Sequence, residues 1–216
     1  MAAGDISTRI DFLNGTNPRT YAVATCLVAG SVYAVVTQGS GSLTVRTVSV
    51  DAAGAISNAL IDSYSFSNDT YPVGIHKVTG TVYAIFYAAT SVYVGIKTIN
   101  IADDGTMTPD PTISTFTGPT ASYVLRGPVE KISTNYFVAP YQKSNDCHIV
   151  TFSISSDGIT IAIADDHTAS KLANYSSFPA HLEYYDSNIW VLAANGTYST
   201  GGRFAIVQTF TIVAGV

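Results

Sequence analysis

Hydrophobic and polar residues alternate along this chain in short runs, and the runs recur as one repeated phrase. The clearest copy is PVGIHKVTGTVYAIFYAATSVYVGIKTINIADDG, at residues 72–105. Its pattern predicts three strands, at residues 73–78, 82–87 and 92–101. The Thr79-Gly80 turn between the first two is short enough to predict an antiparallel hairpin. A turn ending at Gly105 then leads to a fourth predicted strand at residues 111–116, so one repeat predicts a four-stranded antiparallel sheet.

Three series of anchor residues show that the phrase occurs four times. The second predicted strand of each copy carries an aromatic residue: Tyr33, Tyr83, Phe137 and Trp190. Successive members of this series are 50, 54 and 53 residues apart. The third predicted strand carries a threonine: Thr47, Thr98, Thr151 and Thr209. The turn after it carries a glycine: Gly54, Gly105 and Gly158. A period near 50 residues is typical of the blades of a β-propeller.

The two ends of the sequence complement each other. Residues 4–7, GDIS, match residues 54–57, GAIS, and residues 10–12 resemble the strand that follows such a turn, whereas the fourth copy ends after its third strand. We therefore expect one domain over residues 1–216, an all-β fold that forms a four-bladed β-propeller of four-stranded antiparallel blades. The N-terminal strand would close it by pairing with the C-terminal blade, which leaves no exposed sheet edge. The expected blades are residues 20–66, 71–117, 123–166, and 178–213 completed by 5–12.

The sequence resembles tandem-repeat propeller proteins built on the phrase P-x-x-x-x-V-x-G-x-x-Y-A, over nearly its whole length. The second copy holds the phrase most closely, with Pro72, Lys77 or Val78, Gly80, Tyr83 and Ala84. This resemblance implies a fold and no activity. Two other arrangements stay open: the N-terminal strand pairs with a neighbouring chain, or the repeats stack as a sandwich.

The repeat is similar in size to hemopexin-type four-bladed modules, and that resemblance implies a cysteine bridge between the first and last blades. Here the cysteines are Cys26 in the first copy and Cys147 in the third, which lie opposite each other in a ring of four. A disulfide between them would need Cα atoms closer than about 7 Å. We expect two free, packed thiols.

Composition narrows the classes of function. With 12% charged residues and a net charge of −5, the chain lacks the clustered Lys and Arg that bind a phosphate backbone, so we expect no nucleic-acid partner. No apolar run approaches the roughly 18 residues that span a bilayer, and residues 1–13 lack the features of a signal peptide. We expect no membrane insertion and no cofactor. The low charge favours a protein that is extracellular or lies on a virion or cell surface.

One face of the expected disc carries links of variable length and composition, as loops used in binding often do. The repeat places six candidate ligand-binding residues at the channel mouth on that face: Tyr21, Tyr71, Tyr123, Arg126, Phe178 and His181. Aromatic rings beside polar groups stack on sugar rings, so a lectin-like glycan site is one interpretation. Bulky filler packed between the blades is the other.

A second set occupies equivalent positions on the first strand of each repeat: Cys26, His76, Glu130 and Glu183. These residue types would form a ring of metal ligands if all faced the axis. Blade faces also pack on neighbouring blades, so separate polar residues with local partners are the favoured interpretation, and we expect no metal.

Catalysis has no support in the motifs. The sequence contains two acidic pairs, Asp103-Asp104 and Asp165-Asp166, which we interpret as turn residues. A glycosidase needs two carboxylates on opposite sides of a cleft, and adjacent residues of one turn do not supply them. The chain contains no nucleophile elbow, phosphate loop or paired-histidine motif. We expect a non-catalytic interaction or structural module that mediates assembly with other protein subunits, including copies of itself, at a particle or cell surface. A glycan-binding propeller is the alternative, and a glycan-active hydrolase is the third hypothesis.

Overall fold

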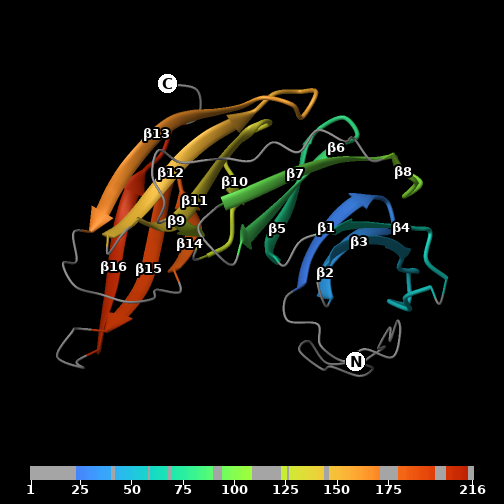
Figure 1. Cartoon of the computed structure of the whole chain (residues 1–216), viewed down its shortest axis with the longest axis horizontal. Helices are drawn as coiled ribbons and strands as arrows, with labels where there is room; N and C mark the ends of the chain where they lie inside the picture. The colour runs from blue at the N-terminus through green and yellow to red at the C-terminus, as the bar shows by residue number, and fades with distance from the viewer. Residues whose placement is uncertain are drawn as a thin grey trace.

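The computed structural model describes residues 23–39, 42–57, 59–67, 70–89, 94–108, 123–125, 127–143, 146–170, 180–197 and 203–213. The regular elements in these ranges are strands, and they form four antiparallel sheets, which confirms an all-β fold (Figure 1). No helix in the described part of the chain is long and apolar enough to cross a membrane.

The sheets follow one another along the chain, and we number them 1 to 4. Sheet 1 contains β1 (Val23–Ala29), β2 (Val32–Gly39), β3 (Ser42–Ser49) and β4 (Asp62–Ser67). Sheet 2 contains β5 (Thr70–Thr79), β6 (Val82–Ala89), β7 (Val94–Ile101) and β8 (Met107–Thr108). In sheet 3, β9 (Tyr123–Leu125) and β10 (Glu130–Lys131) both pair with β11 (Tyr136–Lys143), and β12 (Asp146–Ile154) and β13 (Ile161–Ser170) follow. Sheet 4 contains β14 (Ala180–Asp186), β15 (Ile189–Thr197) and β16 (Arg203–Thr211).

The strand pairings confirm the register of the repeat. The residue after each anchor aromatic pairs with the anchor threonine of the third strand: Ala34 with Thr47, Ala84 with Thr98, Val138 with Thr151, and Val191 with Thr209. On its other side the same residue pairs with the first strand, at Cys26, His76, Glu130 and Glu183. Residues at equivalent positions of the four sheets can therefore be compared directly.

Several boundaries differ from the predicted ones. β5 continues through Thr79, and the hairpin turn is formed by Gly80, whose φ is 52°, and the residue after it. β13 continues through Ser170, so the Asp165-Asp166 pair, which we predicted in a turn, lies in a strand. The first strand of sheet 3 is split into β9 and β10, because Pro128 lies at the break and proline has no N–H for the ladder.

Three hydrophobic clusters of described residues fill the spaces between successive sheets. Residues such as Val36 and Ile85 join sheets 1 and 2, Phe86 and Phe137 join sheets 2 and 3, and Trp190 belongs to the cluster between sheets 3 and 4. Sheets 1 and 4 lie on opposite sides of the view in Figure 1. The described residues thus form a series of four sheets packed face to face. The closing strand at residues 5–12 and the predicted strand at 111–116 lie outside them.

Candidate functional site

Successive sheets share one contact, in which the turn glycine of a sheet packs on the sheet before it. Gly105 and Gly158 are both buried in this way. Thr47 Oγ1 donates a hydrogen bond of 2.7 Å to the Gly105 carbonyl, and Thr98 Oγ1 donates one of 3.2 Å to the Gly158 carbonyl. We call this the threonine–glycine contact. It explains why the two anchors recur together in the sequence.

Only glycine fits this contact well. The φ angles of Gly105 and Gly158 are 92° and 78°, in the left-handed region that other residues seldom adopt. A Cβ on Gly158 would also lie 3.0 Å from Val82 Cγ1 and 3.1 Å from Thr98 Cβ. The turn therefore packs so closely on the preceding sheet that a Cβ would be crowded there.

Carboxylates shape the turns themselves. Asp51 Oδ1 accepts hydrogen bonds from the backbone N–H groups of Ala53 and Ala55, at 2.9 and 2.8 Å. Asp104 Oδ1 accepts from the Thr106 N–H at 2.9 Å, and this bond lowers the pKa of the Asp104 carboxyl. The acidic residues of these turns thus have a local structural role, as expected of Asp in turns.

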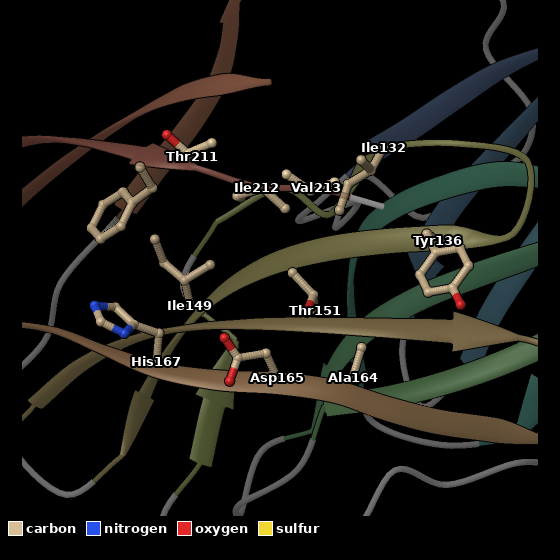
Figure 2. Close-up of a pocket in the computed structure, with 11 residues that line it drawn as sticks. Ile132, Tyr136, Ile149, Thr151, Ala164, Asp165, His167, Thr211, Ile212 and Val213 are labelled. Atoms are coloured by element: carbon tan, nitrogen blue, oxygen red, sulfur yellow. The ribbon is translucent and has the colours of Figure 1, made fainter. Parts of the chain in front are cut away.

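Between sheets 3 and 4 the same position forms a pocket of about 450 Å³ (Figure 2). Tyr136 and Thr151 line it, and they are the equivalents of Val82 and Thr98, which hold Gly158 one interface earlier. The complete lining is Ile132, Tyr136, Ile149, Thr151, Ala164, Asp165, His167, Phe210, Thr211, Ile212 and Val213. Figure 2 shows Ile149 and Thr151 between residues 165–167 of β13 on one side and residues 211–213 on the other.

The other two interfaces show what occupies this position. Met107, two residues after Gly105, packs against the cluster between sheets 1 and 2, and Ile161, three residues after Gly158, packs against the cluster between sheets 2 and 3. Each side chain comes from a fourth strand that begins after the turn glycine. The pocket thus has the lining of a threonine–glycine contact at the third interface.

The side of sheet 4 that points away from sheet 3 is the second notable surface. Val207 is 71% exposed, whereas its equivalents Val45, Ile96 and Ile149 are 0%, 1% and 4% exposed because the next sheet covers them. Tyr185 and Ile189 of the same sheet are also exposed. We call Tyr185, Ile189, Val207 and Thr209 the end face of sheet 4.

Sheet 1 has the complementary surface, the side that would face a preceding sheet. Tyr33 is 36% exposed, whereas Tyr83, Phe137 and Trp190 are 0%, 0% and 3% exposed. Tyr83 also donates a hydrogen bond of 3.2 Å to the Val28 carbonyl of the preceding sheet, and burial raises the pKa of its hydroxyl to about 12. We call Thr25, Leu27, Tyr33 and Val35 the end face of sheet 1. The turn of the same sheet carries Gly54, which is exposed and has no atom within 4 Å of a built Cβ.

The predicted channel-mouth site is only partly within the described residues. Tyr21, Arg126 and Phe178 lie outside them, and for Tyr71 and Tyr123 only the strand positions, in β5 and β9, are described. His181 lies on β14, where its Nε2 is 3.0 Å from Glu183 Oε2 and both side chains are largely exposed. A shared aromatic site therefore stays a prediction.

Three of the four residues predicted as separate polar groups or a metal ring, Cys26, His76 and Glu183, have a local polar partner. The Cys26 thiol donates to the Leu27 carbonyl at 3.3 Å, and His76 Nε2 lies 2.5 Å from the Val129 carbonyl of sheet 3. Burial raises the pKa of Glu130, and the Glu183 carboxylate raises it further. No group of three or more His, Cys, Asp or Glu side chains that would hold a metal occurs among the described residues. Glu130 and Glu183 instead border a second pocket of about 300 Å³ between sheets 3 and 4.

Sequence reasoning missed one polar cluster within sheet 3. Asp166 Oδ1 accepts a hydrogen bond of 2.5 Å from the Tyr141 hydroxyl and lies 3.0 Å from His148 Nδ1. Tyr141 and His148 are buried, and Cys147 beside them has its pKa raised to about 11 by burial. The only available signal was the pairing of Tyr141 opposite His148, which needs the strand register.

Comparison with known proteins shows a similarity of fold alone. No family model and no curated protein matches the sequence. Among solved structures, the chain is similar to a protein from Lactobacillus plantarum determined by the Northeast Structural Genomics Consortium, with a TM-score of 0.53 and 14% identity. The match covers 84% of this chain and 54% of that one, so the chain spans about half the length of that protein.

Proposed function

We propose that the chain is a non-catalytic assembly module whose two end faces bind further protein subunits, in the first place copies of itself. The observation that carries the proposal is the exposure of Val207 at the one sheet that no described sheet follows, while its three equivalents are buried. Burying a valine side chain contributes about 1.5–3 kcal/mol. The end faces therefore favour a partner that packs a further sheet against them, as the sheets within the chain pack on one another.

The internal interfaces support the identity of that partner. The end face of sheet 4 is of the kind that packs on a following sheet, and the end face of sheet 1 is of the kind that packs on a preceding one. These two kinds of face fit each other three times within the chain. A contact between them is head-to-tail, so repetition gives a ring or a filament. The low charged fraction, 12%, suits such packing at a particle or cell surface.

A ring closed within one chain would use the same two faces. In that arrangement sheets 4 and 1 of a single molecule meet, which gives the four-bladed propeller expected from the repeats. The exposure of both faces in the single chain supports contact between copies instead. The glycan-binding alternative has no such support among the described residues, because the side chains of its four aromatic candidates are not among those described.

The test is the native mass by light scattering over a dilution series, with two variants. Val207→Lys places a charge on the end face of sheet 4. Ile163→Lys makes the matched change at a 48% exposed residue of β13, away from both end faces. We expect wild type and I163K to show a multiple of 22.7 kDa that falls on dilution, and V207K to stay at 22.7 kDa. A wild-type mass of 22.7 kDa at every concentration would refute assembly between copies.

A further inference from the structure

The pocket between sheets 3 and 4 has a specific occupant. We infer that it binds residues 1–12 of the adjoining copy, with Gly4 against Thr151 and Ile6 in the pocket beside Ile132. This inference rests on the proposed head-to-tail assembly, and it adds an exchanged strand to the contact between end faces.

The first argument is the conformation of residues 54–57, whose sequence matches that of residues 4–7. Residues 4–7, GDIS, match residues 54–57, GAIS. There Gly54 has a φ of 83°, Ile56 forms a bridge with Val50, and the Ser57 N–H donates to the Ser49 carbonyl at 2.8 Å. A segment of this sequence thus forms the turn and then leads back along the outer side of the third strand.

The second argument is the lining of the pocket. Thr151 is the equivalent of Thr47 and Thr98, whose hydroxyls donate to the carbonyls of the turn glycines. Ile132 follows Lys131 as Val28 follows Leu27, and Val28 belongs to the cluster on which Met107 packs. By this equivalence Gly4 takes the place of Gly105, and Ile6 takes the place of Met107.

The third argument is the edge of sheet 4. The third strands of sheets 1, 2 and 3 pair with a fourth strand on their outer side. Among the described residues β16 pairs with β15 alone. Residues 5–12 are the segment that resembles a fourth strand, and the outer backbone groups of β16 are the ones such a strand would pair with.

The order of the chain decides which copy supplies the segment. A fourth strand is followed in the sequence by the first strand of the next sheet: β4 ends at Ser67 and β5 begins at Thr70 in sheet 2. Residues 5–12 precede β1 of sheet 1, so the sheet that they complete is the one placed before sheet 1. In a head-to-tail assembly that is sheet 4 of the adjoining copy.

The test compares Gly4→Val with Ala3→Val in the full chain. Valine at position 4 disfavours the positive φ and places a Cβ against Tyr136 and Thr151, whereas Ala3 matches Ala53, which is exposed.

Hydrogen–deuterium exchange follows the backbone amides of residues 204–210 in β16, and the amides of β6 and β11 report that the fold is intact. In wild type and A3V we expect slow exchange along the whole of β16. In G4V we expect alternate β16 amides to exchange at least tenfold faster, and the assembly to dissociate at a concentration at least tenfold higher.

The outcomes separate the two proposals. If G4V and A3V are alike in β16 exchange and in dissociation while V207K still disrupts assembly, the exchanged strand is wrong and the end-face contact stands. If wild type is a 22.7 kDa monomer with both edges of β16 protected, the segment binds within its own chain, and both proposals are wrong as stated.

A cross-link keeps the inference testable if G4V fails to fold. Ile6→Cys and Ile132→Cys are placed in separate chains, mixed and oxidised. We expect a covalent dimer from this mixture and none when Ile6→Cys is mixed with Ile163→Cys, whose cysteine lies outside the pocket. Equal dimer yields from both mixtures would overturn the inference.

Discussion

Replacing a turn glycine by alanine should cost stability according to whether a preceding sheet covers it. Gly158 and Gly54 form a matched pair, because their φ angles are 78° and 83°. Alanine in the left-handed region costs about 1–2 kcal/mol at either site. At Gly54 the new Cβ meets no atom within 4 Å, so this backbone cost is the whole expected effect in the dilute single chain.

At Gly158 the new Cβ would lie 3.0–3.1 Å from Val82 and Thr98. Both are β-branched and restricted in χ1, so relief requires a shift of sheet 3 against sheet 2. Overpacking of this kind costs about 1–3 kcal/mol, which brings the total for Gly158→Ala to about 2–5 kcal/mol. Urea denaturation at concentrations where the protein is monomeric measures both variants. Equal losses of unfolding free energy for Gly54→Ala and Gly158→Ala would refute the threonine–glycine contact as a tight steric fit.

Two further predictions concern pH. Burial lowers the pKa of His76, so below its ordinary value of 6.5 the unfolded chain binds a proton that the folded chain does not, and stability falls as the pH falls. His76→Gln, which can keep a donor to the Val129 carbonyl, should make the loss of unfolding free energy between pH 7 and pH 5, measured by urea denaturation, smaller than in wild type. Burial and the Glu183 carboxylate raise the pKa of Glu130, so ionised Glu130 disfavours folding at pH 7. Glu130→Gln should therefore stabilise at pH 7 by less than about 1 kcal/mol, and a gain that persists undiminished well below pH 4.5 would contradict this cause.

The repeat register was predictable because side-chain spacing alone determines it. The anchor aromatics and threonines recur at a nearly constant period, and antiparallel pairing with short turns leaves one register that keeps each set on the same face. The turn glycines were predictable for a similar reason, since Gly54, Gly105 and Gly158 sit after acidic or small turn residues and all have positive φ.

The interfaces between sheets were not predictable to the same extent. Thr47 and Gly105 are 58 residues apart, and their hydrogen bond depends on which face of each sheet the neighbour covers. The exposure of Val207 is likewise invisible in the sequence, where it resembles Val45 or Ile96. The break in the first strand of sheet 3 follows from Pro128, a signal that was present in the sequence.

The most direct test of the assembly is the accessibility of position 207 itself. Val207→Cys introduces a thiol on the end face of sheet 4, and the native thiols give little background because burial raises the pKa of Cys26 and brings that of Cys147 to about 11. The labelling rate of this variant with a maleimide is measured from dilute to concentrated protein, alongside the native mass. We predict that the rate falls at least tenfold over the range in which the mass rises above 22.7 kDa. A rate that stays constant while the mass rises would show that copies associate through another surface, and would contradict the account.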